Sequence, residues 1–399
     1  LFRQYKHPGQ HLFHLDWIYY HEKQQDWKKY GAAFGDSLFA LYDIKPMPTP
    51  IMQELPAKRR RENRVYERGN WLVEGERVQP DAPEILLTRD DQQFHSRLDL
   101  AKWLVREGNP LTARVTVNRF WAQLFGYGIV ETMEDFGSQG FPPSHPELLD
   151  WLAVTFSRDY GWDMKKLLKL MVMSATYRQS SVGDEIKFAL DSKNRLLARG
   201  PKVRLSAEQV RDQALAVSGL LNEEMYGPSV YPPRPDMTAS FWGSWGKSEP
   251  EAQLRRSIYI FWRRTNPYPS MITFDSPTRT VCSSRRVRTN TPLQALTLLN
   301  DPVYYQAAEA LAEQMRKAHP NDLRLQLRYG YFRAMLRQPS EEKLNLLEEM
   351  YRKAEAHYSE KGATASTDDN TETEILPEQE ALKLAANTIL NLDEFINKN

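Results

Sequence analysis

The fold is decided by residues 97–128, which read RLDLAKWLVREGNPLTARVTVNRFWAQLFGYG. Apolar residues recur there at spacings of three and four, which is the pattern of an amphipathic helix with one buried face. Gly108 and Pro110 interrupt this pattern, so we expect one helix to end before them and a second to run through LTARVTVNRFWAQLF. Gly126 follows this second run, at a position where glycine commonly ends a helix. The stretch therefore predicts two helices in succession.

Further helix starts are expected downstream, as far as residue 221. Ser144 precedes Glu147 by three residues, and Ser206 precedes Gln209 by the same distance. This is the spacing of a capping box, in which a serine and an acid or amide satisfy each other's backbone N–H groups, so it predicts a helix start at each serine. Asp163 is expected to cap another helix.

These signals predict a mainly α fold, a multi-helix domain over residues 90–399. Within it we expect an irregular insert at residues 226–292, which is small, contains a strand and is rich in Pro, Trp and Arg; RRSIYIFWRR is its best strand candidate. Helical periodicity returns over residues 292–357. The polar run KGATASTDDNTETE then predicts a mobile loop at residues 361–376, before a final helix.

The segment before this domain is expected to be different. Residues 15–44 carry a helical apolar pattern, which KPMPTP breaks because proline fixes φ and disfavours helix in the residue before it. An extended linker is therefore expected over residues 46–89. Inside it, RVYERGNWLVEGERV predicts a β-hairpin with its turn at Gly69-Asn70.

The composition is that of an ordinary globular protein and excludes several classes of function. The 399 residues include 53 Lys and Arg against 52 Asp and Glu, so no global charge favours nucleic acid. No apolar run approaches the ~20 residues of a transmembrane segment. The single cysteine, Cys282, excludes an intramolecular disulfide, a cysteine zinc site and a C-x-x-C-H haem attachment within this chain. We expect no cofactor here, and a c-type haem only in sequence preceding Leu1. The opening LFRQYKHPGQH also lacks the pattern of a signal peptide.

Several strings resemble a known family. RLDLAKWLVREGNPLTARVTVNRFWAQLFGYGIVETMEDFGSQGFPPSHPELLDWLA is similar to the planctomycete-specific domain of unknown function at the C-terminal end of planctomycete cytochrome-c-type proteins. The same resemblance holds, in the family's order, for GWDMKKLLKLMVMSATYRQS, RLSAEQVRDQALAVSGLL, RRSIYIFWRR, FDSPTRTVCSSRRVRTNTPLQALTLLNDP and the terminal LNLDEF.

This resemblance implies an exported, periplasmic or cell-envelope protein that often carries an N-terminal cytochrome-c-like domain. Residues 46–89 resemble the linker that joins this domain to the preceding one, and residues 1–45 resemble the helical tail of that preceding domain. The protein's own N-terminal domains are therefore expected partners. The family supplies no catalytic residues, so candidate sites come from chemistry alone.

The first candidate site is the polar loop that follows the second helix. Asp135 and His145 could lie near Arg119 as a base and acid pair, or as groups that orient a ligand. The alternative is structural: Arg119 binds Asp135 and holds the loop, while His145 only begins a helix. We favour the structural interpretation because structural ion pairs outnumber catalytic ones.

A second candidate lies on the helix that begins near Ser206. Glu208 and Arg211 or Asp212 share a helix face, because they are three and four residues apart. Arg204 adds a cation nearby. Such pairs usually stabilise the fold, and a buried Arg211 that reaches another helix is more plausible than a ligand role.

The third candidate is a cationic patch in the insert, opposed within its span only by Asp275. Arginine binds carboxylate, sulfate and phosphate through two parallel hydrogen bonds, and nearby aromatic rings such as Trp242 and Trp262 can stack on sugars. Anionic polysaccharide is thus a candidate ligand. The alternative is that the arginines cover apolar surface and pair with acidic helices. The patch comprises Arg255, Arg256, Arg263, Arg264, Arg279, Arg285, Arg286 and Arg288.

Metal and nucleophile sites are not expected. His11 and His14 can share a helix face, but no third ligand has a firm spacing, so the cluster of His7, His11, His14, Asp16 and His21 predicts no metal site. Cys282 has no histidine nearby in sequence that could activate it.

Two hypotheses about function follow. We favour a non-catalytic binding or scaffolding module, in which the insert at 226–292 and the loop at 126–145 form one surface that contacts anionic polysaccharide. The alternative is a carbohydrate-active hydrolase that uses Asp135 with Glu134 or Glu208 as paired carboxylates. Nucleic acid is disfavoured, because the charge is balanced and no known reader motif is present.

Overall fold

The computed structural model describes residues 54–88, 94–234, 245–360, 364–366, 372–374 and 376–398. The chain divides into two compact units between Leu100 and Ala101. The predicted tail at residues 1–45 lies outside the described residues. The boundary proposed at residue 90 stays a prediction.

In the first unit, the predicted hairpin is confirmed. Strand β1 (Asn63–Glu67) pairs antiparallel with β2 (Asn70–Val78), between the short 3-10 helices η2 (Ala57–Arg59) and η3 (Glu84–Leu86). The turn lies one residue earlier than expected, at Arg68-Gly69, since Glu67 pairs with Asn70. Gly69 has a φ of +86°, a conformation that glycine adopts without steric cost.

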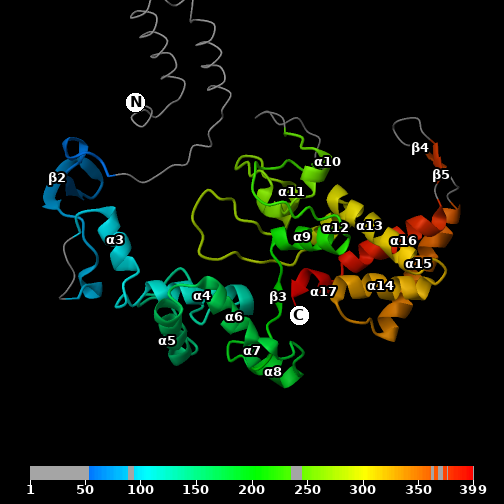
Figure 1. Cartoon of the computed structure of the whole chain (residues 1–399), viewed down its shortest axis with the longest axis horizontal. Helices are drawn as coiled ribbons and strands as arrows, with labels where there is room; N and C mark the ends of the chain where they lie inside the picture. The colour runs from blue at the N-terminus through cyan, green and yellow to red at the C-terminus, as the bar shows by residue number, and fades with distance from the viewer. Residues whose placement is uncertain are drawn as a thin grey trace, which may run out of the picture. The chain divides into compact units, whose positions relative to one another are not determined.

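In the second unit, the fold is mainly α, as predicted (Figure 1). Helix α3 (Arg97–Leu104) begins in the first unit and continues into the second. The second unit then holds a run of helices with their own hydrophobic cluster, which includes Val117, Phe156 and Leu167. These are α4 (Thr112–Phe125), α5 (Pro146–Val154), the π-helical η4 (Thr155–Asp159), α6 (Met164–Met173), α7 (Ala175–Arg178) and α8 (Glu185–Leu190).

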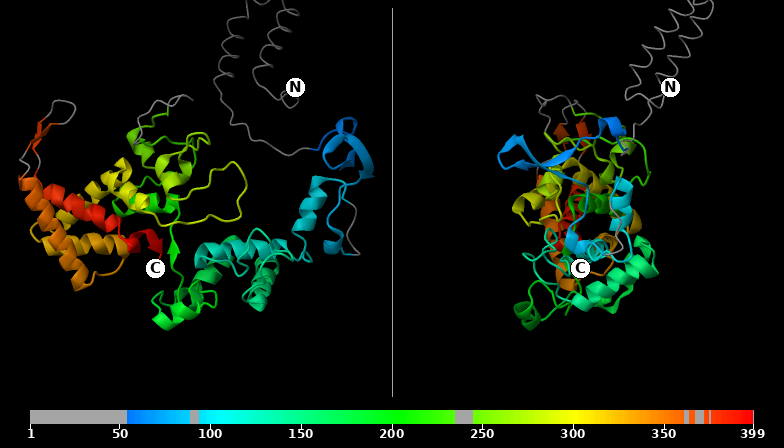
Figure 2. Two further views of the ribbon diagram at one scale, coloured as in Figure 1. Left: turned by 180° about the vertical axis from the view of Figure 1, so that it is seen from behind. Right: turned by 90° about the vertical axis from the view of Figure 1, so that its left-hand side faces the viewer.

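A larger hydrophobic cluster lies among the later helices, and α13 is at its centre, where Ala307, Ala308 and Leu311 are fully buried. Gly330 allows the close approach of α14, because a Cβ there would lie 2.6 Å from the sulfur of Met315. Figures 1 and 2 show these helices gathered side by side. They are α9 (Ala207–Val217), α11 (Pro269–Thr273), α12 (Pro292–Asn300), α13 (Pro302–Ala318), α14 (Leu323–Met335), α15 (Glu341–Glu360), α16 (Pro377–Leu390) and α17 (Asp393–Ile396).

Outside the hairpin, the described residues contain two pairs of short strands. β3 (Val203–Arg204) pairs with β6 (Asn397–Lys398), which ties the start of α9 to the C-terminal segment. In the polar segment at 361–376, β4 (Thr364–Ser366) pairs with β5 (Glu372–Glu374), while residues 361–363, 367–371 and 375 lie outside the described residues.

The capping predictions have mixed outcomes. Ser206 and Gln209 form the full capping box of α9, and the carboxylate of Asp163 accepts hydrogen bonds from two N–H groups of α6. The prediction of a capping box at Ser144 and Glu147 is wrong, because α5 has no side-chain cap there. Helix α5 instead begins with Pro146 after His145, because the Ser144 hydroxyl donates to the carbonyl of Ile129.

The strand prediction for RRSIYIFWRR is also wrong. The segment contains the 3-10 turn η5 (Ser257–Tyr259), close to the short helix α10 (Pro250–Gln253), and Ile260 makes only an isolated bridge with Val230. β-propensity reflects packing against a neighbouring strand, and the described residues provide none here. Side chains of α9 bind the segment's backbone groups instead. The Ser257 N–H, for example, donates to the carboxylate of Asp212 at 2.7 Å.

No helix in the described residues is long and apolar enough to cross a membrane.

Candidate functional site

The arginine-rich segment forms a long loop between α11 and α12, residues 276–291, which we call the arginine loop. Figure 1 draws it as the yellow-green loop that extends toward α4. Asp275 closes its base, because its carboxylate accepts hydrogen bonds from the N–H of Thr289 at 2.6 Å and from the Thr289 hydroxyl at 2.9 Å. Loops of this length without regular structure are uncommon unless they have a function.

On one side, the arginine loop is held by Glu208 of α9. The Glu208 carboxylate lies 2.6 Å from Nη1 of Arg286 and 3.9 Å from Nη2 of Arg279, and it accepts a hydrogen bond from the Ser276 hydroxyl at 3.5 Å. Only 18% of the Glu208 side chain is exposed. Burial raises the pKa of Glu208, but the hydrogen bond and charge of Arg286 outweigh it, so this pKa lies below its ordinary value. Glu208 is therefore ionised at neutral pH.

On the other side, the arginine loop is held by Glu134, in the 126–145 loop. Nη2 of Arg285 lies 3.4 Å from the Glu134 carboxylate, and the Ser284 hydroxyl donates to it at 3.4 Å. Both side chains of the Arg285–Glu134 pair are about half exposed, at 46% and 49%. The insert and the 126–145 loop thus contact each other at Glu134, while their role as one binding surface stays a prediction.

The 126–145 loop is itself fixed from within. The buried side-chain amide of Asn118, on α4, donates to the carbonyl of Val130 and accepts from the N–H of Val130, each at 2.9 Å. These two bonds hold the loop's first residues against α4, so that Glu134 is carried on an anchored segment.

The arginine loop keeps an excess of positive charge after this pairing. It carries four arginines and no acid, and it contacts three carboxylates: those of Glu134 and Glu208, which pair with its arginines, and that of Asp275, which binds Thr289. Arg288 is half-buried and has no acidic partner among the described residues. Burial, and then repulsion from Arg286, lower the pKa of its guanidinium, as expected for a cation that lacks compensation. The guanidinium of Arg279 lies over the ring of Trp262, 4.9 Å from its centroid.

Two of the candidate arginines, Arg211 and Arg255, are buried and stabilise the fold. Arg211 is fully buried, and it donates to the carbonyls of Arg255 and Gln253 at 3.0 and 2.6 Å. Arg255 is also buried; it donates to the carbonyls of Glu224, Pro228 and Tyr226, with its guanidinium 4.0 Å from the centroid of the Tyr259 ring. Both side chains stabilise the insert and neither reaches the surface.

The remaining candidate residues lie outside the arginine loop. Arg256 and Arg264 are exposed, and Arg263 is half-buried. Arg204 donates to the side chain of the buried Gln294, next to the base of the arginine loop. Trp242 lies outside the described residues, as do His7, His11, His14, Asp16 and His21.

Asp135, His145 and Arg119 do not form one constellation. The Asp135 carboxylate accepts from the N–H of Gly137 at 2.7 Å, and Nδ1 of His145 lies 3.0 Å from the hydroxyl of Ser144. Arg119 is exposed on α4, and no hydrogen bond or ion pair joins it to the other two among the described residues. The contacts of Asp135 and His145 are thus with residues next to them in sequence.

The pKa shifts of the acidic groups bear on whether this part of the structure could supply a general acid. A general acid at neutral pH needs a raised pKa, whereas the pKa of Glu208 is lowered by Arg286. Burial does raise the pKa of Asp301, but this carboxylate is enclosed and caps α13 by accepting from the N–H of Val303. The described residues contain no group of three or more His, Cys, Asp or Glu side chains that could hold a metal ion.

The structure also contains a polar cluster that the sequence analysis missed. The carboxylate of Glu394, on α17, accepts hydrogen bonds from the hydroxyl of Tyr331 and from Lys343, and forms an ion pair with Arg337 at 3.0 Å. Burial raises the pKa of Glu394, but these three partners together lower it to about 2. No sequence signal indicates this cluster, because its donors come from α14, α15 and the turn between them.

Comparison with known proteins identifies a family. The model of the family described as PSD1, Protein of unknown function (DUF1553), matches residues 96–351. No curated protein matches the chain. No solved structure matches it either.

Proposed function

The chain belongs to the PSD1 family of proteins of unknown function (DUF1553), and from this premise we propose that it is a non-catalytic binding module whose arginine loop contacts anionic polysaccharide. The family name supplies no activity, so the proposal depends on the chemistry of the loop.

The charge excess of the arginine loop is the observation that carries this proposal. Three of the loop's four guanidiniums share two carboxylates, and the fourth, that of Arg288, has no acidic partner among the described residues. Each guanidinium has five N–H donors in a fixed fork, so even a paired arginine retains donors for a second anion. A chain of repeated sulfates or carboxylates can meet several of these donors at once.

A sugar polymer suits this loop better than a compact anion. The Trp262 ring is half-buried at the start of the loop, where Arg279 covers one of its faces and its Nε1 donates to the carbonyl of Thr278 at 3.2 Å. Aromatic faces bind the apolar faces of sugar rings, while the arginines bind the attached anionic groups.

The setting we propose follows from the family resemblance. An exported module of the cell envelope, joined to its own N-terminal domains and to a cytochrome-c-like partner domain, would encounter anionic wall or capsular polysaccharide. In this role the chain acts as a scaffold that holds its attached domains to the polymer.

The experiment that tests this proposal is a titration with heparin and with neutral dextran, beside the variant Arg285→Ala. The Arg285–Glu134 pair is half exposed, so its loss should change the free energy of unfolding by only ~0 to 1 kcal/mol. We expect heparin to bind and dextran not to bind, the affinity for heparin to fall with added salt, and Arg285→Ala to weaken heparin binding several-fold.

The matched control is Arg316→Ala on α13, an exposed arginine that also pairs with one glutamate, Glu313. It should leave heparin affinity unchanged. Equal affinity for heparin and dextran, or the same loss in both variants, would contradict the proposal.

A further inference from the structure

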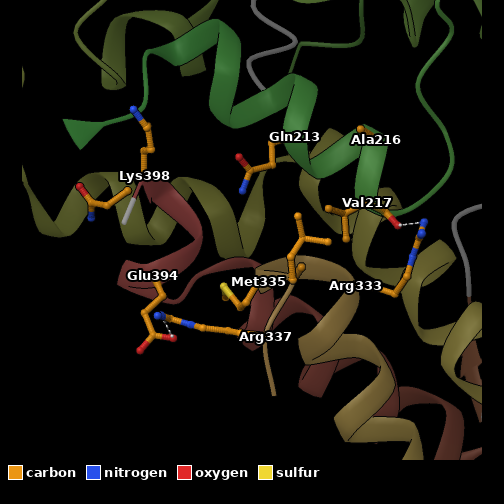
Figure 3. A pocket seen from close by; sticks show the side chains of 11 residues that line it. Gln213, Ala216, Val217, Arg333, Met335, Arg337, Glu394 and Lys398 are labelled. Atoms are coloured by element: carbon orange, nitrogen blue, oxygen red, sulfur yellow. Dashed lines mark hydrogen bonds and ion pairs between the residues drawn. The ribbon is translucent and has the colours of Figure 1, made fainter. Parts of the chain in front are cut away.

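A second candidate site lies away from the arginine loop, at the end of α14. A hollow of about 560 Å³ is lined there by residues of α9, α14 and the C-terminal segment. Its volume is within the range of small-molecule sites. Figure 3 shows its labelled side chains, with Val217 and Met335 lying between the guanidiniums of Arg333 and Arg337.

The lining combines an apolar floor with a cationic rim. Val217, Ala334, Met335 and Leu336 supply apolar side chains. The charged lining residues are Arg333, Arg337, Lys398 and Glu394. Arg337 pairs with Glu394, and the Lys398 ammonium donates to the carbonyl of Leu124, so Arg333 supplies the cationic group that is open to a ligand. The lining as a whole therefore favours a ligand that is both apolar and anionic.

Glu394 does not offset the preference of the lining for an anionic ligand. Glu394 already accepts hydrogen bonds from Tyr331 and Lys343 and pairs with Arg337, so little acceptor capacity remains for a cationic ligand. Arg333 is exposed and makes one hydrogen bond in the described residues, from Nη2 to the carbonyl of Val217 at 3.2 Å. Most of its donors are thus available at the edge of the hollow.

Leu336 ends α14 at this hollow and is one of its apolar lining residues. It ends α14 in the left-handed conformation, with φ 55° and ψ 23°, where an L side chain costs about 1 to 2 kcal/mol. Its side chain is also 80% exposed at the same place. The conformation belongs to the end of the helix, because the Leu336 N–H donates to the carbonyl of Phe332, and it leaves the side chain open to a ligand.

We propose that this hollow binds a small organic carboxylate with an apolar body. Arg333 pairs with the carboxylate, and Val217, Met335 and Leu336 contact the body. This site is separate from the arginine loop and does not depend on the polysaccharide proposal.

The test uses two matched pairs of probes, titrated into the full chain by calorimetry. Octanoate is compared with octanol, and N-acetylphenylalanine with its amide, because each pair differs in the carboxylate alone. We expect at least one carboxylate to bind about 10-fold or more tightly than its neutral partner, consistent with a charge-assisted hydrogen bond. Binding of octanoate alone indicates an aliphatic acid as the ligand class, and binding of N-acetylphenylalanine alone indicates a peptide C-terminus.

Two variants locate the binding in the hollow. Arg333→Ala should weaken the preferred carboxylate about 10-fold and leave the neutral probe unchanged. Leu336→Gly should weaken the same probe several-fold without lowering the melting temperature, because glycine adopts positive φ without steric cost. If Leu336 had only a structural role, Leu336→Gly would not weaken binding while leaving the melting temperature unchanged.

Each of the two substitutions has a control of the same kind at a position away from the hollow. Arg316→Ala removes an exposed arginine from α13, and Tyr226→Gly relieves another left-handed residue, which has a φ of 68° and is 79% exposed. Neither should change the affinity. Equal binding of charged and neutral probes, no binding of any probe, or unchanged affinity in Arg333→Ala would overturn the proposal.

Discussion

The guanidinium of Arg286 lies 2.6 Å from the carboxylate of Glu208, and this ion pair joins the arginine loop to α9. A polyanion that binds the loop must share or replace this carboxylate. The same contact that orders the loop therefore competes with the proposed ligand.

Glu208→Gln should increase the affinity for heparin several-fold, because it removes the competing charge. It should also lower the free energy of unfolding by about 1 to 3 kcal/mol, since the partly buried Arg286 contact loses its charged acceptor. Parallel heparin titration and urea unfolding measure the two effects. Glu313→Gln, at the exposed pair with Arg316, is the control and should change neither quantity appreciably. A loss of heparin affinity in Glu208→Gln would show that the ordered loop, rather than its charge, determines binding.

Arg255→Ala should destabilise the protein by about 3 kcal/mol or more, because it removes the buried side chain that donates to the carbonyls of Glu224, Tyr226 and Pro228 and opens a cavity beside Tyr259. Arg256→Ala removes the adjacent, exposed arginine and should cost less than about 0.5 kcal/mol. Thermal unfolding of the two variants makes the comparison directly. Similar melting temperatures would mean that Arg255 is not the support of the insert.

Ser206→Ala should lower the free energy of unfolding by about 1 kcal/mol, because it removes the hydroxyl that accepts from the N–H of Gln209 at the start of α9. Ser144→Ala is the matched comparison from the same sequence pattern. Its hydroxyl caps no helix, so the loss should be smaller. Chemical denaturation of both variants tests the difference, and a larger effect at Ser144 would contradict this account.

Glu394 should make the protein sensitive to acid. Its pKa falls from the ordinary value of 4.5 to about 2 in the folded chain, so its stabilising contribution is fully present above about pH 4.5 and is lost as the pH falls through about 2. Glu394→Gln should lower stability by about 1 to 3 kcal/mol at pH 7 and flatten the decline between pH 4.5 and 2.

Urea unfolding at several pH values measures how the free energy of unfolding of the parent protein and of Glu394→Gln depends on pH. Glu309→Gln, an exposed acid on α13 with no ion pair among the described residues, should retain the decline seen in the parent protein. An unchanged slope in Glu394→Gln would show that other carboxylates cause the acid sensitivity.

The sequence by itself determined the local features of this protein. The helical class, the capping box at Ser206, the cap at Asp163 and the hairpin near Gly69 depend on residues within a few positions of one another, so pattern and spacing predict them. The concentration of arginines in the insert is equally a property of the sequence.

The tertiary structure decided which polar groups meet. RRSIYIFWRR has strand-forming residues but no neighbouring strand among the described residues, so side chains of α9 bind its backbone instead. Arg255 is an internal support, while Arg285 and Arg286 remain at the surface, although all three belong to the same arginine-rich insert. Glu394 and its donors come from different helices, and the hollow at Leu336 exists only where those helices end together. Burial and partner choice depend on contacts between distant segments, because the free energy of an ionic group is set by the solvent and charges around it, and these are absent from any local pattern.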